Sequence, residues 1–458
     1  MAARVTALAL VALGVGCANG GTERPNPGVN TIGGTSAEGG EEDTTAGDDD
    51  DDDDDDADTT AGDSDEGSDG DTTMGLPDDP PDLSDGTWVF ENVSMTVGIS
   101  LNGQRAMLDD GREIITWAQS NPDDIGNVNV LTALGPEGWP VSYVTDFDGV
   151  QNTFPFLAGG ERGLLVWSGR TNANDDHDIW LVRSQGDGWT PAENLSDPFE
   201  GDPELTDTEP VILRRSDGGV AVVYLAQEVS KFGAPPPEIF VSKFFEDNEP
   251  SGRFELSPEG GNCTRAAGAT APSDVFHVVF ACSDGGSTLV HATDRSGEWD
   301  TNELAGVTSS VLSPNMGNGP DGVGLVWIQH APCGEDDCDE VFYATTNSDE
   351  VFGTPIQVTD TANLNERMPA VGIDPWGRVL VLAQARLDNV ARLYLSLAED
   401  GETFGESERI SPDGVDDYQT PNSIGFDAQG NPSFVLEVVE DGSDPLNIEI
   451  NRAHFVPN

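Results

Sequence analysis

Lysine is almost absent from this sequence of 458 residues, in which Lys231 and Lys243 are the only two. Acidic residues outnumber Lys and Arg by 85 to 20, which gives a formal net charge of −65 at pH 7. A surface of this charge repels the phosphates of nucleic acids and of anionic lipid headgroups. We therefore expect no nucleic-acid binding, and a preference for cationic ligands, divalent metal ions or basic partners.

Catalytic signatures and helical patterns are missing as well. The sequence contains no G-x-S-x-G, no H-E-x-x-H and no phosphate-binding glycine loop. After the N-terminus it has no long stretch with the periodicity of an amphipathic helix. The five histidines are scattered, and we expect His277 and His291, which lie in predicted strands, to be packed and not to bind metal. These absences favour an all-β protein and supply no motif for an enzyme.

What the sequence does contain is a repeat of paired strands, spaced by roughly 47 to 57 residues, the length of a four-stranded propeller blade. The first strand of each pair is an apolar run, at 111–119, 162–169, 218–226, 274–282, 321–329, 377–385 and 430–439. The second strand tends to alternate apolar and polar residues and begins at Asn127, Asp178, Glu238, Ser287, Glu340, Ala391 or Asn447. An aromatic residue recurs at the equivalent place in five first strands: Trp117, Trp167, Tyr224, Phe280 and Trp327. We predict a seven-bladed β-propeller; a different division of one repeat would give six or eight blades.

Ring closure and the working face follow from the same repeat. The last repeat has room for three strands before Asn458, and we predict that residues 87–97 supply its outer strand, beside residues 447–455. If the strands of a blade run outward from the channel, the loops from strand two to strand three and from strand four to the next blade share one face. These loops are longer and more acidic than the turns opposite. We expect function there, since variable loops on a rigid scaffold usually carry binding.

The N-terminal region is interpreted as an export signal. It contains Arg4, an apolar stretch from Val5 to Val15 and small residues before Cys17, and it is too short to span a membrane stably. The end, Leu13-Gly14-Val15-Gly16-Cys17, resembles a bacterial lipobox. The resemblance implies cleavage before Cys17 and lipid attachment to its sulfur, with a plain secretory signal as the alternative. Ala18, where aspartate would signal inner-membrane retention, favours an outer-membrane lipoprotein that faces the periplasm or the cell surface.

Residues 18–85 are rich in Gly, Thr, Ser, Pro and Asp and include an unbroken aspartate run at 48–56. Such a segment has almost nothing to bury, so we predict a disordered acidic linker between the signal at 1–17 and a propeller at 86–458.

The remaining cysteines number four, an even count that suits two disulfides. Cys263 and Cys282 flank a turn at 271–274 and fall opposite one another in the resulting hairpin, within disulfide reach. Cys333 and Cys338 close a small loop. A zinc site is the alternative, but the spacing lacks a neighbouring Cys or His pair. Two disulfides indicate an oxidising compartment, which agrees with export to the cell envelope.

Two segments resemble known propeller repeats. DIWLVRSQGDGWTPAENLSD, residues 178–197, resembles the TolB-type WD40-like repeat, and LAEDGETF, residues 397–404, resembles the sialidase Asp-box. These resemblances cover one or two blades and imply propeller architecture. Likeness to sialidases also implies an alternative function, a glycoside-acting enzyme with an arginine cluster at the channel mouth. Its candidate residues are Arg105, Arg265, Arg367, Tyr418, Asp207 and Glu209.

Calcium is the one cofactor that the sequence suggests. Asparagine and aspartate oxygens cluster in one loop, and hard oxygen ligands suit this ion; solvated turns are the alternative. The candidate ligands are Asn172, Asn174, Asp175, Asp176 and Asp178. Whether or not calcium binds, we expect a monomeric, membrane-anchored module that binds or scaffolds a protein or glycan in the cell envelope. We favour this function over that of an enzyme.

Overall fold

The computed structural model describes residues 77, 79–95, 98–121, 124–135, 138–145, 151–170, 176–186, 188–196, 205–228, 236–246, 252–258, 261–283, 287–307, 311–333, 336–359, 366–387, 390–414, 417–419, 423–439 and 447–458. The chain divides into two compact units, Met1–Asp71 and Thr72–Asn458, and every described residue belongs to the second. Cys17 and the aspartate run lie outside the described residues.

Seven antiparallel sheets, here blades 1 to 7 in chain order, make up the second unit. Blade 1 contains β2 (Ser100–Met107), β3 (Glu113–Asn121), β4 (Asp124–Gly135) and β5 (Val141–Tyr143). Blade 2 contains β6 (Asn152–Ala158), β7 (Leu164–Gly169), β8 (Asp178–Gln185), β9 (Gly188–Trp189) and β10 (Glu193–Asn194). Blade 3 contains β11 (Leu205–Arg214), β12 (Gly219–Glu228), β13 (Glu238–Phe245) and β14 (Arg253–Glu255). Blade 4 contains β15 (Cys263–Thr270), β16 (Phe276–Ser283), β17 (Ser287–Thr293) and β18 (Asp300–Glu303).

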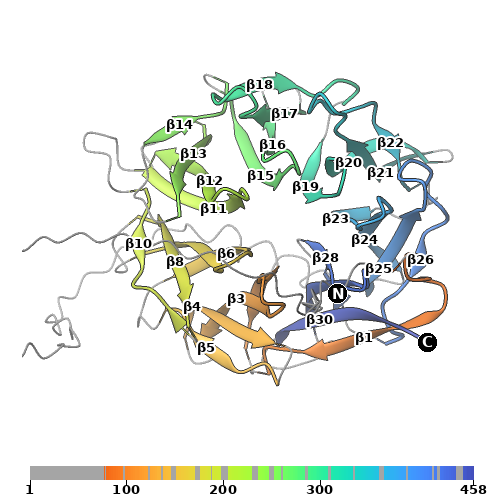
Figure 1. The fold of residues 1–458 in the computed structure, drawn as a ribbon, viewed down its shortest axis with the longest axis horizontal. Helices are drawn as coiled ribbons and strands as arrows, with labels where there is room; N and C mark the ends of the chain where they lie inside the picture. The colour runs from red at the N-terminus through yellow and green to blue at the C-terminus, as the bar shows by residue number, and fades with distance from the viewer. Residues whose placement is uncertain are drawn as a thin grey trace, which may run out of the picture. The chain divides into compact units, whose positions relative to one another are not determined.

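The later blades follow the same order. Blade 5 contains β19 (Leu312–Asn318), β20 (Val323–Cys333), β21 (Asp336–Thr345) and β22 (Ile356–Gln357). Blade 6 contains β23 (Glu366–Ile373), β24 (Val379–Leu387), β25 (Val390–Ala398) and β26 (Glu408–Arg409). Blade 7 contains β27 (Asp417–Tyr418) and β28 (Ile424–Phe426), which both pair with β29 (Pro432–Val439), followed by β30 (Ile448–Pro457) and β1 (Gly86–Asn92). In Figure 1 strands β6, β11, β15, β19, β23 and β28 line the centre, and β1, β5, β10, β14, β18, β22 and β26 lie outside.

The paired strands predicted from the sequence are the second and third strands of each blade, and the prediction of a seven-bladed propeller is confirmed. The second strands are mostly apolar because neighbouring blades cover both of their faces. In β7, for example, every residue is buried. No helix of the described residues has the length and apolar content needed to cross a membrane.

The hydrophobic core lies between the blades. Each of seven clusters of buried side chains contains residues from two consecutive blades. One of them joins the last blade to the first: Ile115 and Trp117 of blade 1 pack with Val435 and Ile450 of blade 7. The ring is therefore closed by the same contacts that stack every other pair of blades.

The outer strand of blade 7 comes from the N-terminal side of the propeller, as predicted. Strand β1 pairs antiparallel with β30, from Gly86 opposite Pro457 to Asn92 opposite Asn451. A backbone bond that follows the outer strand of every blade recurs here, with Val93 N–H donating to Ile450 O at 2.8 Å. The other six equivalents donate from Val144, Leu195, Leu256, Leu304, Val358 and Ile410, at 2.7–3.0 Å. Residues 87–92 are thus a fourth strand equivalent to those of the other blades.

The two faces of the ring follow from this connectivity. The upper face carries the loops from strand two to strand three and from each outer strand to the next blade; the lower face carries the turns from strand one to two and from three to four. Both Gly86 and Pro457 end their strands on the lower face. Residues before Gly86 also contact this side: Arg378, in the first turn of blade 6, donates from Nη1 to Pro81 O at 2.9 Å.

Candidate functional site

A β-bulge recurs at the same place in the innermost strands of blades 1 to 6. In each, two residues of the first strand face one residue of the second, as in a bulge that re-aims side chains. The first bulge residue has a positive φ of 48–57° in every case, although none is glycine. These six residues are here named the bulge ring: Asn102, Phe154, Glu209, Arg265, Ser313 and Met368.

The sequence favours the bulge in two ways. The single residue opposite is the recurring aromatic in five blades, and its ring is buried. In blade 6 the equivalent residue is Ala383. The second bulge residue is proline in four blades: Pro155, Pro210, Pro314 and Pro369. Proline has no N–H to donate to the ladder, so it is tolerated at bulges. A proline that recurs near the start of four first strands is the signal that could have revealed the bulge ring from the sequence.

The bulge ring lies near the start of the first strands and therefore towards the upper face, where function was predicted. Its members on blades 3 to 5 are in contact or close together. Arg265 donates from Nη1 to Ser313 Oγ at 2.7 Å. Burial raises the pKa of the Glu209 carboxyl, and the nearby positive charge of Arg265 partly offsets this. Arg265 and Met368 are exposed, with Met368 at 47% of its full accessible area.

Blade 7 contributes a carboxylate to the ring. The backbone N–H of Asn102 donates to Glu437 Oε1 at 2.7 Å. Burial raises the pKa of Glu437 to about 7, and the Asn102 hydrogen bond works in the opposite direction. A carboxyl with this pKa can exchange a proton near neutral pH. Sequence reasoning missed Glu437 because it lies in an apolar second strand.

Three of the proposed catalytic residues are buried and do not belong to the bulge ring. Arg105, expected at the channel mouth, is buried and donates from Nε to Glu113 Oε1 at 2.6 Å, which corrects that expectation. Tyr418 is buried against Phe90, with ring centroids 5.9 Å apart. Asp207 is buried in blade 3. Of the six, Arg265 and Glu209 come together, and Arg367 immediately precedes Met368 of the ring and is exposed.

The calcium prediction falls mostly on residues that the structure leaves out. Asn172, Asn174 and Asp175 lie outside the described residues. The Asp178 carboxylate accepts hydrogen bonds from Asn194 Nδ2 at 3.1 Å and Ser196 Oγ at 3.4 Å, which tie strand three to the outer strand. Within the described part of the chain, including Asp176 and Asp178, no group of three or more His, Cys, Asp or Glu side chains is arranged to hold a metal ion.

One of the two predicted disulfides is confirmed, and the other lies partly outside the described residues. Cys263 and Cys282 form a disulfide with Cα atoms 4.0 Å apart, and they are register partners in blade 4, so this pairing is confirmed. Cys338 is also disulfide-bonded. The side chain of Cys333, its predicted partner, lies outside the described residues.

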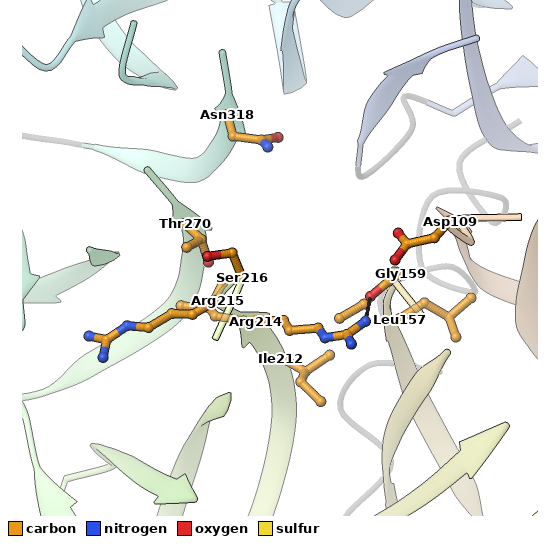
Figure 2. A pocket seen from close by; sticks show the side chains of 12 residues that line it. Asp109, Leu157, Gly159, Ile212, Arg214, Arg215, Ser216, Thr270 and Asn318 are labelled. Atoms are coloured by element: carbon orange, nitrogen blue, oxygen red, sulfur yellow. Dashed lines mark hydrogen bonds between the residues drawn. The ribbon is translucent and has the colours of Figure 1, made fainter. Parts of the chain in front are cut away.

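A cavity of about 540 Å³ opens at the lower face, where the turns of several blades meet. Its cationic side chains already join blades: Arg214 donates to Gly159 O at 2.6 Å and forms an ion pair with Glu246. Arg215 pairs with Asp294 and lies 4.2 Å from the centroid of the Phe276 ring. Figure 2 shows Arg214 reaching Gly159 and Arg215 directed away from Asp109. The arginines that line the lower cavity therefore connect neighbouring blades, and we interpret the cavity as a structural feature.

Comparison with known proteins finds structural resemblances alone. No protein-family model matches the sequence, and no curated protein matches it. The structural resemblances include a polysaccharide lyase of family PL25, an ulvan lyase, at 10% identity over 64% of this chain and 78% of that one, with a TM-score of 0.46. A Hadza microbial sialidase is 14% identical over 73% and 74%, with a TM-score of 0.44. An α-L-arabinanase of Penicillium chrysogenum is 14% identical over 81% and 98%, with a TM-score of 0.44. Likeness at these values says nothing about activity.

Proposed function

We propose that this protein is a binding module whose ligand, a glycan or a segment of a partner protein, contacts the bulge ring on the upper face. The observation that supports this is a constant backbone carrying different side chains. A non-glycine residue at positive φ costs on the order of 1–3 kcal/mol, and such residues concentrate at binding and catalytic sites. A purely structural bulge would be served by glycine, yet the six positions hold Asn, Phe, Glu, Arg, Ser and Met. Varied side chains on a repeated scaffold suit recognition.

The chemistry of the ring suits a ligand with both polar and apolar surface. Arg265, Glu209 and Ser313 supply hydrogen-bond donors and acceptors next to one another. The half-buried Phe154 on blade 2 and Met368 on blade 6 flank these three residues in the blade order and supply apolar surface. Ligand sites commonly combine a few positioned polar groups with apolar contacts of this kind. No nucleic acid is expected, because the acidic surface repels phosphates.

A glycoside-acting enzyme is the second candidate, and Glu437 is the observation in its favour. A carboxyl with a pKa near 7 is suited to act as a general acid on a glycosidic oxygen. The buried positions of Arg105 and Tyr418 count against the arginine-cluster form of this function. Hydrolysis of a bound glycan that is lost in Glu437→Gln, with binding retained, would favour the enzyme over the binding module.

We further propose that the chain is an exported, monomeric outer-membrane lipoprotein anchored through Cys17. The Cys263–Cys282 disulfide supports an oxidising compartment. Residues 79–85, which would connect the propeller to the anchor, contact the lower face through Pro81. Mass spectrometry of the mature N-terminus tests this, and an unmodified N-terminus at another residue would contradict it.

Binding is tested with the full chain bearing Cys17→Ser, so that it is secreted without lipid. The protein is applied to a glycan array and, in parallel, used for pull-down from envelope extract. We expect a ligand whose binding is lost in Arg265→Ala and reduced in Met368→Ala. The matched control is Arg295→Ala, an exposed arginine of blade 4 on the lower face. A ligand that binds all three variants equally would place the site elsewhere.

A further inference from the structure

The disulfide of blade 4 lies next to the bulge that carries Arg265. Cys263 pairs with Cys282 and Thr264 with Ala281, and the bulge of Arg265 and Ala266 follows directly, before the ladder resumes at Ala267. Both cysteines are buried. Only two register pairs thus precede the bulge in β15, and a covalent bond joins the first of them.

Blade 4 differs from most blades in lacking proline at its bulge. Pro155, Pro210, Pro314 and Pro369 fill the second bulge position in blades 2, 3, 5 and 6. Proline fixes its own φ near −65° and has no N–H that would need a partner in the ladder, so it limits the conformations of the second bulge residue and favours the bulge over regular pairing. Blade 4 has Ala266 at this position and blade 1 has Gly103. Neither residue restricts the backbone in that way.

The two blades without proline share a compensating feature. In blade 1 the register pair that precedes the bulge, Ser100 and Gln119, is joined by a side-chain hydrogen bond of 2.6 Å. In blade 4 the equivalent pair is Cys263 and Cys282. In blades 2, 3 and 6, which have proline, the second-strand partner at this position cannot make such a link: Gly169, Ala226 and Ala385.

We infer that the Cys263–Cys282 disulfide takes the place of the bulge proline and positions Arg265 in the bulge ring. Arg265 holds a positive φ of 55° while donating to Ser313 of the next blade. A bulge with a free strand end and no proline would sample other backbone conformations, and each would redirect this side chain. Cys263 and Cys282 are positioning residues, and their importance for ligand binding rests on the function proposed above.

The test uses four forms of the full Cys17→Ser chain: this parent, Cys263→Ala/Cys282→Ala, the same pair with Ala266→Pro, and Cys333→Ala/Cys338→Ala as a control. Hydrogen exchange by mass spectrometry follows the peptide containing residues 264–269. We expect exchange at least about tenfold faster without the Cys263–Cys282 bond, as for a locally opened segment. Ala266→Pro should restore slow exchange, and the control pair should leave this peptide unchanged.

Arginine reactivity gives a readout of the side chain itself. Modification of Arg265 by phenylglyoxal is measured relative to Arg295 in the same molecule. We expect the rate at which phenylglyoxal modifies Arg265 to differ from the parent's in the double variant. With Ala266→Pro added, this rate should return to the parent's value. Unchanged exchange and reactivity in the double variant would overturn the inference, as would failure of proline to restore them. If the double variant does not fold, Ala266→Pro must restore folding, and its failure to do so also counts against the inference.

These outcomes are separable from the proposed function. Exchange and reactivity report on Arg265 whether or not a ligand has been found. If a ligand is found on the array, its binding should fall in the double variant and recover with Ala266→Pro. Slow exchange restored without recovery of binding would retain the positioning role and reject the ligand site at Arg265.

Discussion

Glu113 of blade 1 accepts from Arg452 of blade 7 at 2.8 Å, across the junction where the ring closes. Its other oxygen accepts from Arg105 at 2.6 Å, and the side chains of Glu113 and Arg105 are about 5% exposed or less. One carboxylate therefore links two guanidinium groups, one in the first blade and one in the last.

Glu113→Gln should destabilise the protein by about 3–5 kcal/mol, because removing one partner of a buried ion pair leaves an uncompensated charge. Chemical denaturation measures the loss. Asp349→Asn is the control, since the Arg295–Asp349 pair is exposed and its atoms are 3.8 Å apart; it should cost less than about 1 kcal/mol. Equal effects of the two substitutions would show that burial does not decide the contribution.

Stability should depend on pH through the histidines of blade 4. His277 lies 3.0 Å from His291 and 3.0 Å from Glu350, with the rings stacked and Asp294 and Phe352 nearby. Burial lowers the pKa of His291 to about 3 and also lowers that of His277. The unfolded chain binds these protons near pH 6.5, so stability is full above that pH and falls as pH drops towards the folded pKa.

Replacing one of these histidines tests that window. Between pH 7.5 and pH 5, His291 alone should contribute a loss on the order of 2 kcal/mol in denaturation experiments. His291→Gln keeps a donor for His277 and removes this titration, so its stability should change less over the same interval. Parallel pH profiles for the two proteins would contradict the assignment.

Removal of the closing strand should open the ring. A chain that starts at Ile99 loses β1, including Trp88, whose ring centroid lies 5.3 Å from that of Phe434, and Phe90 beside Tyr418. Full burial of such a side chain is worth about 1.5–3 kcal/mol, and these two are half-buried. The matched control starts at Pro77 and keeps the Pro81 and Leu83 contacts. The shorter chain should melt lower or aggregate; equal melting temperatures would argue against closure by β1.

Gly160→Ala should disturb the junction between blades 2 and 3. Gly160 has a φ of 117°, and a Cβ there would overlap Arg214 Nη1, which donates to Gly159 O. Gly111→Ala is the control, because its φ is 84° and the space around it is open. Gly111→Ala should lower the free energy of unfolding by about 1–2 kcal/mol through backbone strain alone. Gly160→Ala should lower it by more. Similar losses in thermal denaturation would mean that Arg214 simply moves aside.

The sequence alone predicted seven blades, the second and third strands, the Cys263–Cys282 pair and the strand that closes the ring. Each depends on local pattern: apolar runs at a regular spacing, alternation along a strand, and symmetric placement about a turn. These features follow from burial and from the two-residue period of a strand.

The tertiary structure decided which residues reach the site. Arg105 and Arg265 both stand near the start of a first strand, yet Arg105 is buried against Glu113 and Arg265 is exposed beside Ser313. The difference comes from the bulge, which contains Arg265 and ends before Arg105, and which changes the side-chain alternation of the strand. Whether a bulge forms depends on the residue opposite, the proline or cross-strand link beside it, and the packing of the next blade. Those contacts join residues far apart in the chain, so the pattern of a single strand cannot reveal them.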